Sequence, residues 1–102
     1  KHHILTEGKD LKVNGPKMNL IHNFKSENLT TVQLYEIEKQ YYLSITDTEN
    51  AEGYLFRAPG DLSEGFPVYG KTNGITNDID LDGKLNYLIG GESGMIYNYV
   101  VE

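Results

Sequence analysis

Short stretches in which apolar and polar residues alternate, separated by turn-forming residues, fill most of the chain. An alternation with a period of two places successive side chains on opposite faces of a β-strand. Strands are predicted over residues 3–6, 10–13, 19–24, 30–37, 41–46, 53–57, 66–69, 75–79, 86–90 and 95–101. Turn signals such as Asn14-Gly15-Pro16 and Asn73-Gly74 lie between them. The pattern predicts an all-β fold of antiparallel meander sheets.

Residues 32–43 allow a second interpretation. Leu34, Ile37 and Tyr41 recur at the spacing of one helix face, and good helix formers lie between them. Two strands joined by a turn at Glu38-Lys39-Gln40 are preferred, because the internal repeat described next requires a hairpin at this place. The helix stays an alternative.

Three similar segments follow one another along the chain. Leu11-Lys12-Val13, Tyr54-Leu55-Phe56 and Ile96-Tyr97-Asn98-Tyr99 are about 43 residues apart, within the period of β-propeller blades. Each follows another apolar strand pattern in the same order. The chain is therefore interpreted as a single β-repeat domain with a partial blade over 1–24, a blade over 30–69 and a blade over 75–101.

Composition narrows the function classes. A chain of 102 residues suits one core, and its formal charge of −6 with nine scattered basic residues argues against nucleic-acid binding. There is no cysteine, which removes disulfides and thiolate chemistry, and no apolar stretch has the length of a membrane span. The start at Lys1-His2-His3, without a methionine, suggests a piece of a longer protein.

The run from Asp78 to Asn86 carries the most specific chemistry. Its Asp-x-Asp-x-Asp-Gly order directs three carboxylates to one point and includes a glycine for a sharp turn, which suits Ca²⁺. An EF-hand is excluded, because Ile89 stands at the twelfth loop position and no helix pattern flanks the loop. The alternative is a tight surface turn whose aspartates accept local N–H groups.

The acidic run, followed by Tyr87-Leu88-Ile89-Gly90-Gly91 and preceded by Gly65-Phe66-Pro67-Val68, resembles the FG-GAP or VCBS type of β-propeller repeat over roughly residues 40–101. Asn86 stands where that family usually has Asp. The resemblance implies a larger, bacterial, extracytoplasmic protein that is periplasmic, secreted or on the cell surface. It also implies a weak calcium site. The expected ligands are Asp78, Asp80, Asp82 and Asn86, with the Lys84 carbonyl completing the set.

A closed propeller usually has four to eight blades, so this chain alone would leave sheet edges open. It is expected to continue in a parent protein, to associate with other copies of itself or with protein partners, or to fold back into a sandwich-like pair of sheets.

Catalytic signatures are weak, and the chain is not expected to be an enzyme. Gly91-Glu92-Ser93-Gly94-Met95 lacks the last glycine of a nucleophile elbow and is interpreted as a hairpin turn.

The other residues with reactive or aromatic side chains are given structural roles. His22 is expected to be packed or on a strand surface. Asp47, Glu49 and Glu52 are attributed to a solvated turn. Tyr42, Tyr54 and Tyr87 are expected in the core. Because aromatic rings can stack on sugars, the eight tyrosines also leave a carbohydrate-binding module as an alternative function. A non-catalytic part of a secreted hydrolase is the other alternative.

Overall fold

The computed structural model describes residues 2–77 and 85–101, and in this part of the chain the fold is all-β with antiparallel pairing throughout. The first strands are β1 (His3–Glu7), β2 (Asp10–Asn14), β3 (Asn19–Asn23), β4 (Gln33–Ile37), β5 (Gln40–Asp47) and β6 (Glu52–Arg57). They are followed by β7 (Asp61–Leu62), β8 (Val68–Tyr69), β9 (Ile75–Asn77), β10 (Leu85–Gly90) and β11 (Ile96–Val101). A single turn of 3-10 helix, η1 (Glu92–Gly94), joins the last two strands.

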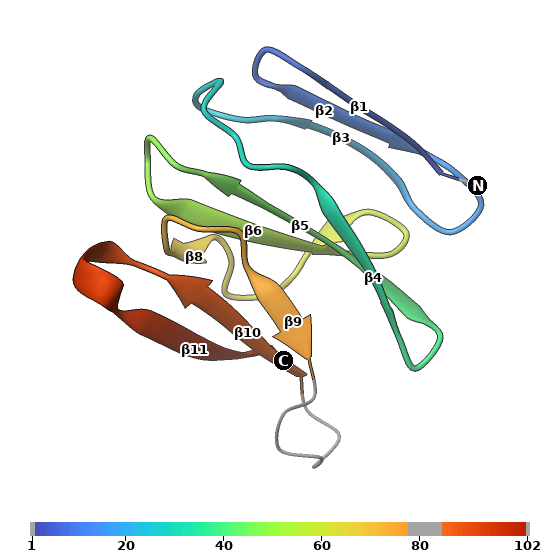
Figure 1. Ribbon diagram of the computed structural model, residues 1–102. Helices are drawn as coiled ribbons and strands as arrows, with labels where there is room; N and C mark the ends of the chain where they lie inside the picture. The colour runs from blue at the N-terminus through green and yellow to red at the C-terminus, as the bar shows by residue number, and fades with distance from the viewer. Residues whose placement is uncertain (1, 78–84, 102) are drawn as a thin grey trace.

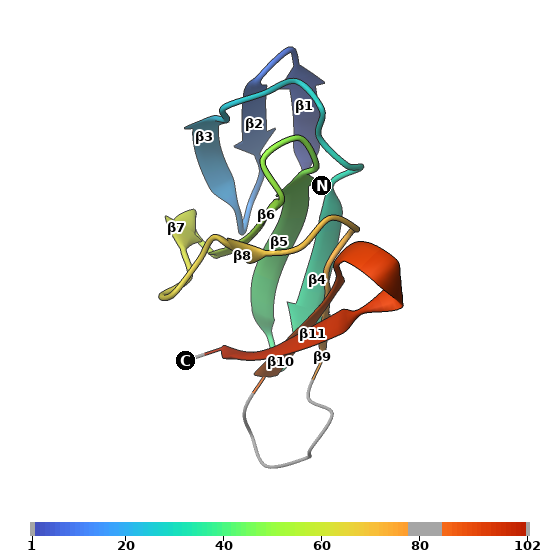
Figure 2. The ribbon, with the colours of Figure 1, turned by 90° about the vertical axis from the view of Figure 1, so that its left-hand side faces the viewer.

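The strands form three sheets that lie in layers (Figures 1 and 2). The first sheet has the order β1-β2-β3, the middle sheet β4-β5-β6-β7 with β8 also on β6, and the third sheet β11-β10-β9. The first and third sheets are meanders in which consecutive strands are neighbours, and the middle sheet is a meander up to β7, after which β8 returns to pair with β6. No helix in the described part of the chain has the length and apolar character needed to cross a membrane.

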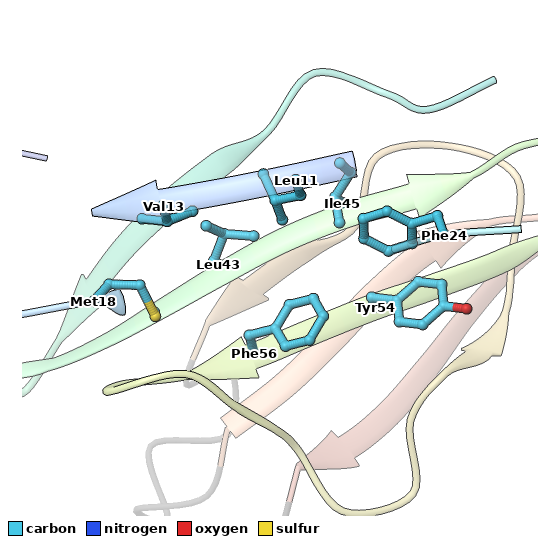
Figure 3. Close-up of a cluster of buried hydrophobic side chains, with 8 residues drawn as sticks. All are labelled: Leu11, Val13, Met18, Phe24, Leu43, Ile45, Tyr54 and Phe56. Carbon is cyan, nitrogen blue, oxygen red and sulfur yellow. The ribbon is translucent and has the colours of Figure 1, made fainter. Parts of the chain in front are cut away.

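The first apolar cluster lies between the first and middle sheets (Figure 3). Leu11 and Val13 of β2 point toward Leu43 and Ile45 of β5, and all four side chains are at most 2% exposed. The remaining members are Met18, Phe24, Tyr54 and Phe56. Burial of these large side chains stabilises the contact between the two sheets.

The second cluster lies on the other side of the middle sheet. Tyr42 and Leu55 of the middle sheet pack against Tyr87 and Ile89 of β10. The Phe66 ring meets the Tyr87 ring edge-on, with their centroids 5.1 Å apart. β5 is therefore buried on both faces from Tyr42 to Asp47, which explains why its sequence does not alternate cleanly. The expectation that Tyr42, Tyr54 and Tyr87 belong to the core is confirmed.

Buried hydroxyl groups fix how closely the third sheet approaches the middle one. Ser44 Oγ lies 3.1 Å from the Tyr87 hydroxyl, and it donates to the Gly74 carbonyl at 3.3 Å. Thr46 Oγ1 donates to the Thr72 carbonyl at 2.8 Å. A side chain at position 74 would overlap the Tyr87 ring, so the close contact between the backbone of residue 74 and that ring requires glycine.

The two-strand interpretation of residues 32–43 is confirmed. β4 and β5 form a hairpin, and its turn residues Glu38 and Lys39 have φ values of 50° and 69°. A pair of positive φ values is typical of the tight hairpin turn whose twist matches the flanking strands. A continuous helix cannot contain that pair.

Several predicted bounds were wrong. Residues 30–32 lie outside β4, because Leu29 makes an isolated bridge to Asp47 and Thr30 N donates to the Thr46 carbonyl. The strand predicted from Phe66 begins at Val68, since Pro67 has no N–H to donate to a ladder. The short β7 was missed. Positions 78 and 79, predicted as the end of a strand, lie outside the described residues.

Candidate functional site

The residues predicted to bind calcium fall mostly in the segment between β9 and β10. Asp78, Asp80, Asp82 and Lys84 lie outside the described residues, so their part of the site stays a prediction. Asn86 is described and lies in β10, opposite Asn77 of β9 and Val100 of β11. It is the last residue of the acidic run.

Asn86 is buried with one half of its amide unused. Its side chain is 2% exposed, and Nδ2 donates to Asn98 Oδ1 at 3.0 Å. Its Oδ1 has no hydrogen-bond partner among the described residues. An amide oxygen is a ligand type that Ca²⁺ accepts, so Asn86 fits the predicted role. Residues 2–77 and 85–101 contain no group of three or more His, Asp or Glu side chains placed to hold a metal ion.

A second buried polar group surrounds Asp47 at the end of β5, where the sequence predicted only a solvated turn. Its Oδ1 accepts hydrogen bonds from Ser26 Oγ at 2.8 Å and from the backbone N–H groups of Glu49 and Asn50, each at 3.1 Å. Its Oδ2 accepts from Asn50 Nδ2 at 2.8 Å. The carboxylate closes the β5–β6 turn and ties it to the segment that links the first two sheets.

The environment of Asp47 favours its charged form. Burial raises the pKa of Asp47, but the hydrogen bonds from Asn50, Ser26 and Glu49 outweigh it, and the net pKa is lowered. The prediction of a solvated turn is wrong for Asp47, whose side chain is 0% exposed. It is confirmed for Glu49, which is exposed. With both oxygens occupied by protein donors, this carboxylate holds the turn together and is not placed to act as a base.

The outer face of the third sheet carries several exposed apolar side chains. The register places Leu88 between Ile75 on β9 and Asn98 on β11, with Ile96 and Val100 on the same side of β11. Ile96 is 73% exposed, and Ile75, Met95 and Val100 are each 54% exposed. We call Ile75, Leu88, Met95, Ile96 and Val100 the apolar face. A shallow hollow of about 470 Å³ lies over much of it.

This face carried a signal in the sequence. In β11 the inward positions are Tyr97, Tyr99 and Val101, and the outward ones include Ile96 and Val100, so both faces are apolar. A strand exposed on one face normally alternates apolar with polar residues. The departure from alternation therefore indicates that β11 has apolar side chains on both of its faces.

The residues considered for catalysis are far apart in the fold. His22 lies on the inner face of β3, with its ring centroid 4.4 Å from that of Phe24, and burial lowers its pKa. Ser93 lies in η1 at the end of the third sheet, with a φ of 57°. The first and third sheets lie on opposite sides of the middle sheet, so these two side chains do not form a pair (Figure 1). The interpretation of residues 91–95 as a hairpin turn is confirmed.

Tyrosine rings gather beside the third sheet. The Tyr69 and Tyr97 rings meet edge-on at 5.5 Å, and Tyr97 and Tyr99 are stacked at 6.3 Å. The Tyr99 hydroxyl donates to the Tyr69 carbonyl at 3.1 Å. Tyr69 is 42% exposed, so one ring of this group is accessible to a ligand.

Comparisons with protein-family models, curated proteins and solved structures found no match for this chain. The resemblance to FG-GAP or VCBS repeats therefore rests on the sequence motifs alone.

Proposed function

We propose that this chain is a non-catalytic structural or interaction module of a propeller-like extracytoplasmic protein, and that it binds calcium weakly through its acidic loop. The observation that carries the proposal is the apolar face at one end of the stack. The middle sheet is covered on both sides by its neighbours, whereas on the outer side of the third sheet Ile75, Ile96 and Val100 are exposed among the described residues. A contiguous exposed apolar patch is typical of a surface that meets another protein.

The competing class is a hydrolase, and the test is direct. The purified chain is assayed against chromogenic esters and glycosides beside the Ser93→Ala variant. We expect no turnover from either protein, since Ser93 and His22 lie in different sheets. Turnover by the chain that Ser93→Ala abolishes would reject the non-catalytic role.

The calcium part of the proposal is tested by NMR titration. We expect Ca²⁺ to shift the Asn86 side-chain amide signals with a dissociation constant on the order of 10⁻⁴–10⁻³ M, the range of extracellular calcium modules. Asp80→Asn should weaken this response at least about tenfold by removing one ligand charge. Asp61→Asn, in β7 and outside the acidic run, is the matched control and should leave it unchanged. Equal responses from all three proteins would contradict a specific site.

A carbohydrate-binding role is the second candidate, and the accessible Tyr69 ring beside Tyr97 favours it. Aromatic rings stack on the apolar faces of sugars. A glycan panel read out by tyrosine fluorescence tests this role, with Tyr69→Ala as the variant. Binding that depends on Tyr69 would support this candidate over the module, and no response across the panel would remove it.

A further inference from the structure

We propose that the open edge of β11 binds an extended peptide strand of a partner protein, which joins the third sheet beside β11 and places a basic side chain next to Glu64. The inference deepens the proposed function and rests on it, because it names the surface through which the interaction module binds a protein. Adding a strand to an open sheet edge is a common mode of peptide recognition, in which main-chain hydrogen bonds supply the affinity.

The hydrogen bonds at the hairpin end of the third sheet show which backbone groups of β11 point outward. Gly91 N donates to the Met95 carbonyl at 2.8 Å, so this pair bonds across the hairpin. Gly90, which is opposite Ile96, bonds on the other side of β10, where its N–H donates to Thr72 Oγ1 at 2.8 Å. Bonded and unbonded pairs alternate along an antiparallel ladder. Every second residue of β11, starting from Ile96, therefore turns its N–H and C=O groups away from β10.

These outward residues are Ile96, Asn98 and Val100. The third sheet ends at β11, and no backbone hydrogen bond among the described residues reaches their outward groups (Figure 1). Unpaired N–H and C=O groups along a strand edge are a template for pairing with another chain. An added strand would bond to all three residues.

The other sheet edges in the described part of the chain are shorter, charged or covered. β9 has three residues, and β7 and β8 have two each. β1 contains Glu7 and β4 contains Glu36, and charged side chains on an edge strand discourage pairing. At β3, Asn19 N donates to the Pro59 carbonyl at 2.6 Å, and a loop thereby covers the start of that edge. β11 has six residues, none of them charged, proline or glycine.

A hollow of about 350 Å³ adjoins the C-terminal half of β11 and offers room for one side chain of the added strand. It is lined by Glu64, Gly65, Phe66, Val68, Tyr99 and Val100. Tyr99 packs on the inner face of the third sheet, in the second apolar cluster. Alternate side chains of an added strand point to that same face, because successive residues of a strand alternate between the two faces of a sheet.

The charge beside the hollow favours a basic side chain. Glu64 is exposed and makes no ion pair with a described residue. The stem of a lysine or arginine can lie on Phe66 and Val68 while its cationic head meets the Glu64 carboxylate. The formal charge of −6 also favours the approach of a basic peptide over an acidic one. A second copy fits less well, because its β11 has no basic residue and it carries the same net charge.

The test is an NMR titration of the 102-residue chain with a synthetic capped peptide in which threonine and valine alternate around one arginine. We expect the peptide to shift the backbone amide signals of Ile96, Asn98 and Val100 and to slow their hydrogen exchange. The amides of Tyr97 and Tyr99 already bond to β10, so their exchange rates should change less. This alternation distinguishes strand addition from binding on a side-chain face.

Three variants and a second peptide define the contact. Val100→Pro removes an outward N–H without removing a bond to β10, and should weaken binding by about tenfold or more. Glu64→Gln should weaken binding about threefold, the size expected for an exposed ion pair. Glu27→Gln removes the same charge outside the hollow and should leave the affinity unchanged. The same peptide with glutamate in place of arginine should bind at least about tenfold more weakly.

Unchanged amide signals, or equal affinities for the arginine and glutamate peptides, would overturn the inference. So would slowed exchange at Ile96, Asn98 and Val100 on raising the protein concentration without peptide, since that result assigns the edge to a second copy. Circular dichroism confirms that each variant is folded, and Glu64→Gln carries the test if Val100→Pro does not fold. The proposed module role fails instead on the hydrolase assay, whichever peptide result is found, so the two failures are distinguishable.

Discussion

Asp47 and Asn86 are both buried polar side chains, and they differ in how fully their oxygen atoms are used. Both Asp47 oxygens accept hydrogen bonds from the protein, whereas Asn86 Oδ1 accepts none among the described residues. A buried acceptor without a donor costs free energy unless a ligand or another group supplies the missing contact. Asp47 therefore stabilises the fold, whereas the role of Asn86 as a calcium ligand stays a prediction.

At the residue scale we predict that Asp47→Asn lowers the free energy of unfolding by about 1–3 kcal/mol at pH 7. The variant keeps one oxygen, but its new NH₂ group meets the Asn50 Nδ2 donor. The pKa of Asp47 is lowered in the folded state, so its contribution is complete above the ordinary value of 3.8 and is lost as the pH falls through the lowered value.

Urea denaturation between pH 7 and pH 2 measures this loss. The difference between the wild type and Asp47→Asn should narrow below about pH 4. Glu27→Gln, at an exposed carboxylate, is the control and should follow the wild type at every pH. A constant difference down to pH 2 would show that the charge of Asp47 contributes nothing.

At the scale of elements, the β4–β5 turn holds two ordinary residues in a conformation that favours Asn and Gly. Both Glu38 and Lys39 are exposed. We predict that the double variant Glu38→Asn, Lys39→Gly raises the free energy of unfolding by about 1 kcal/mol, measured by urea denaturation. Lys39→Ala is the control, because alanine keeps the strain, and an equal gain from it would contradict the explanation.

Most of the strands could be predicted because each carries a local pattern that needs no partner to be recognised. The hairpin at Glu38 and Lys39 was identified only through the repeat, since the local residues also suit a helix. β7 has two residues, too few to show a period. Ser26 and Asp47 are 21 residues apart in the sequence, so no local sequence pattern predicts the hydrogen bond between them. Of the predicted calcium ligands, only Asn86 could be compared with the structure.

At the scale of the whole molecule, the middle sheet belongs to both apolar clusters. Ile45 of β5 lies in one cluster, and Tyr42 of the same strand lies in the other. Loss of the middle sheet would remove one wall from each cluster at once. This shared wall couples the three layers in a single folding unit.

We therefore predict one unfolding transition. Ile45→Val in the first cluster and Ile89→Val in the second should each lower the free energy of unfolding by about 1 kcal/mol and shift the same transition. Far-UV circular dichroism and tyrosine fluorescence, followed in the same urea titration, should coincide for all three proteins. Two separate transitions, each moved by only one variant, would contradict the coupling.

The layered arrangement also has a mechanical consequence. Within each sheet, strands are joined by ladders of backbone hydrogen bonds, while neighbouring sheets are held mainly by side-chain packing. The chain enters in the first sheet and leaves from the third (Figure 2). Tension between its ends therefore acts across the side-chain contacts between the sheets as well as on the ladders within them. Under load we expect the contacts between sheets to separate before the ladders within them, because apolar packing is non-directional whereas the ladders are held by directional hydrogen bonds.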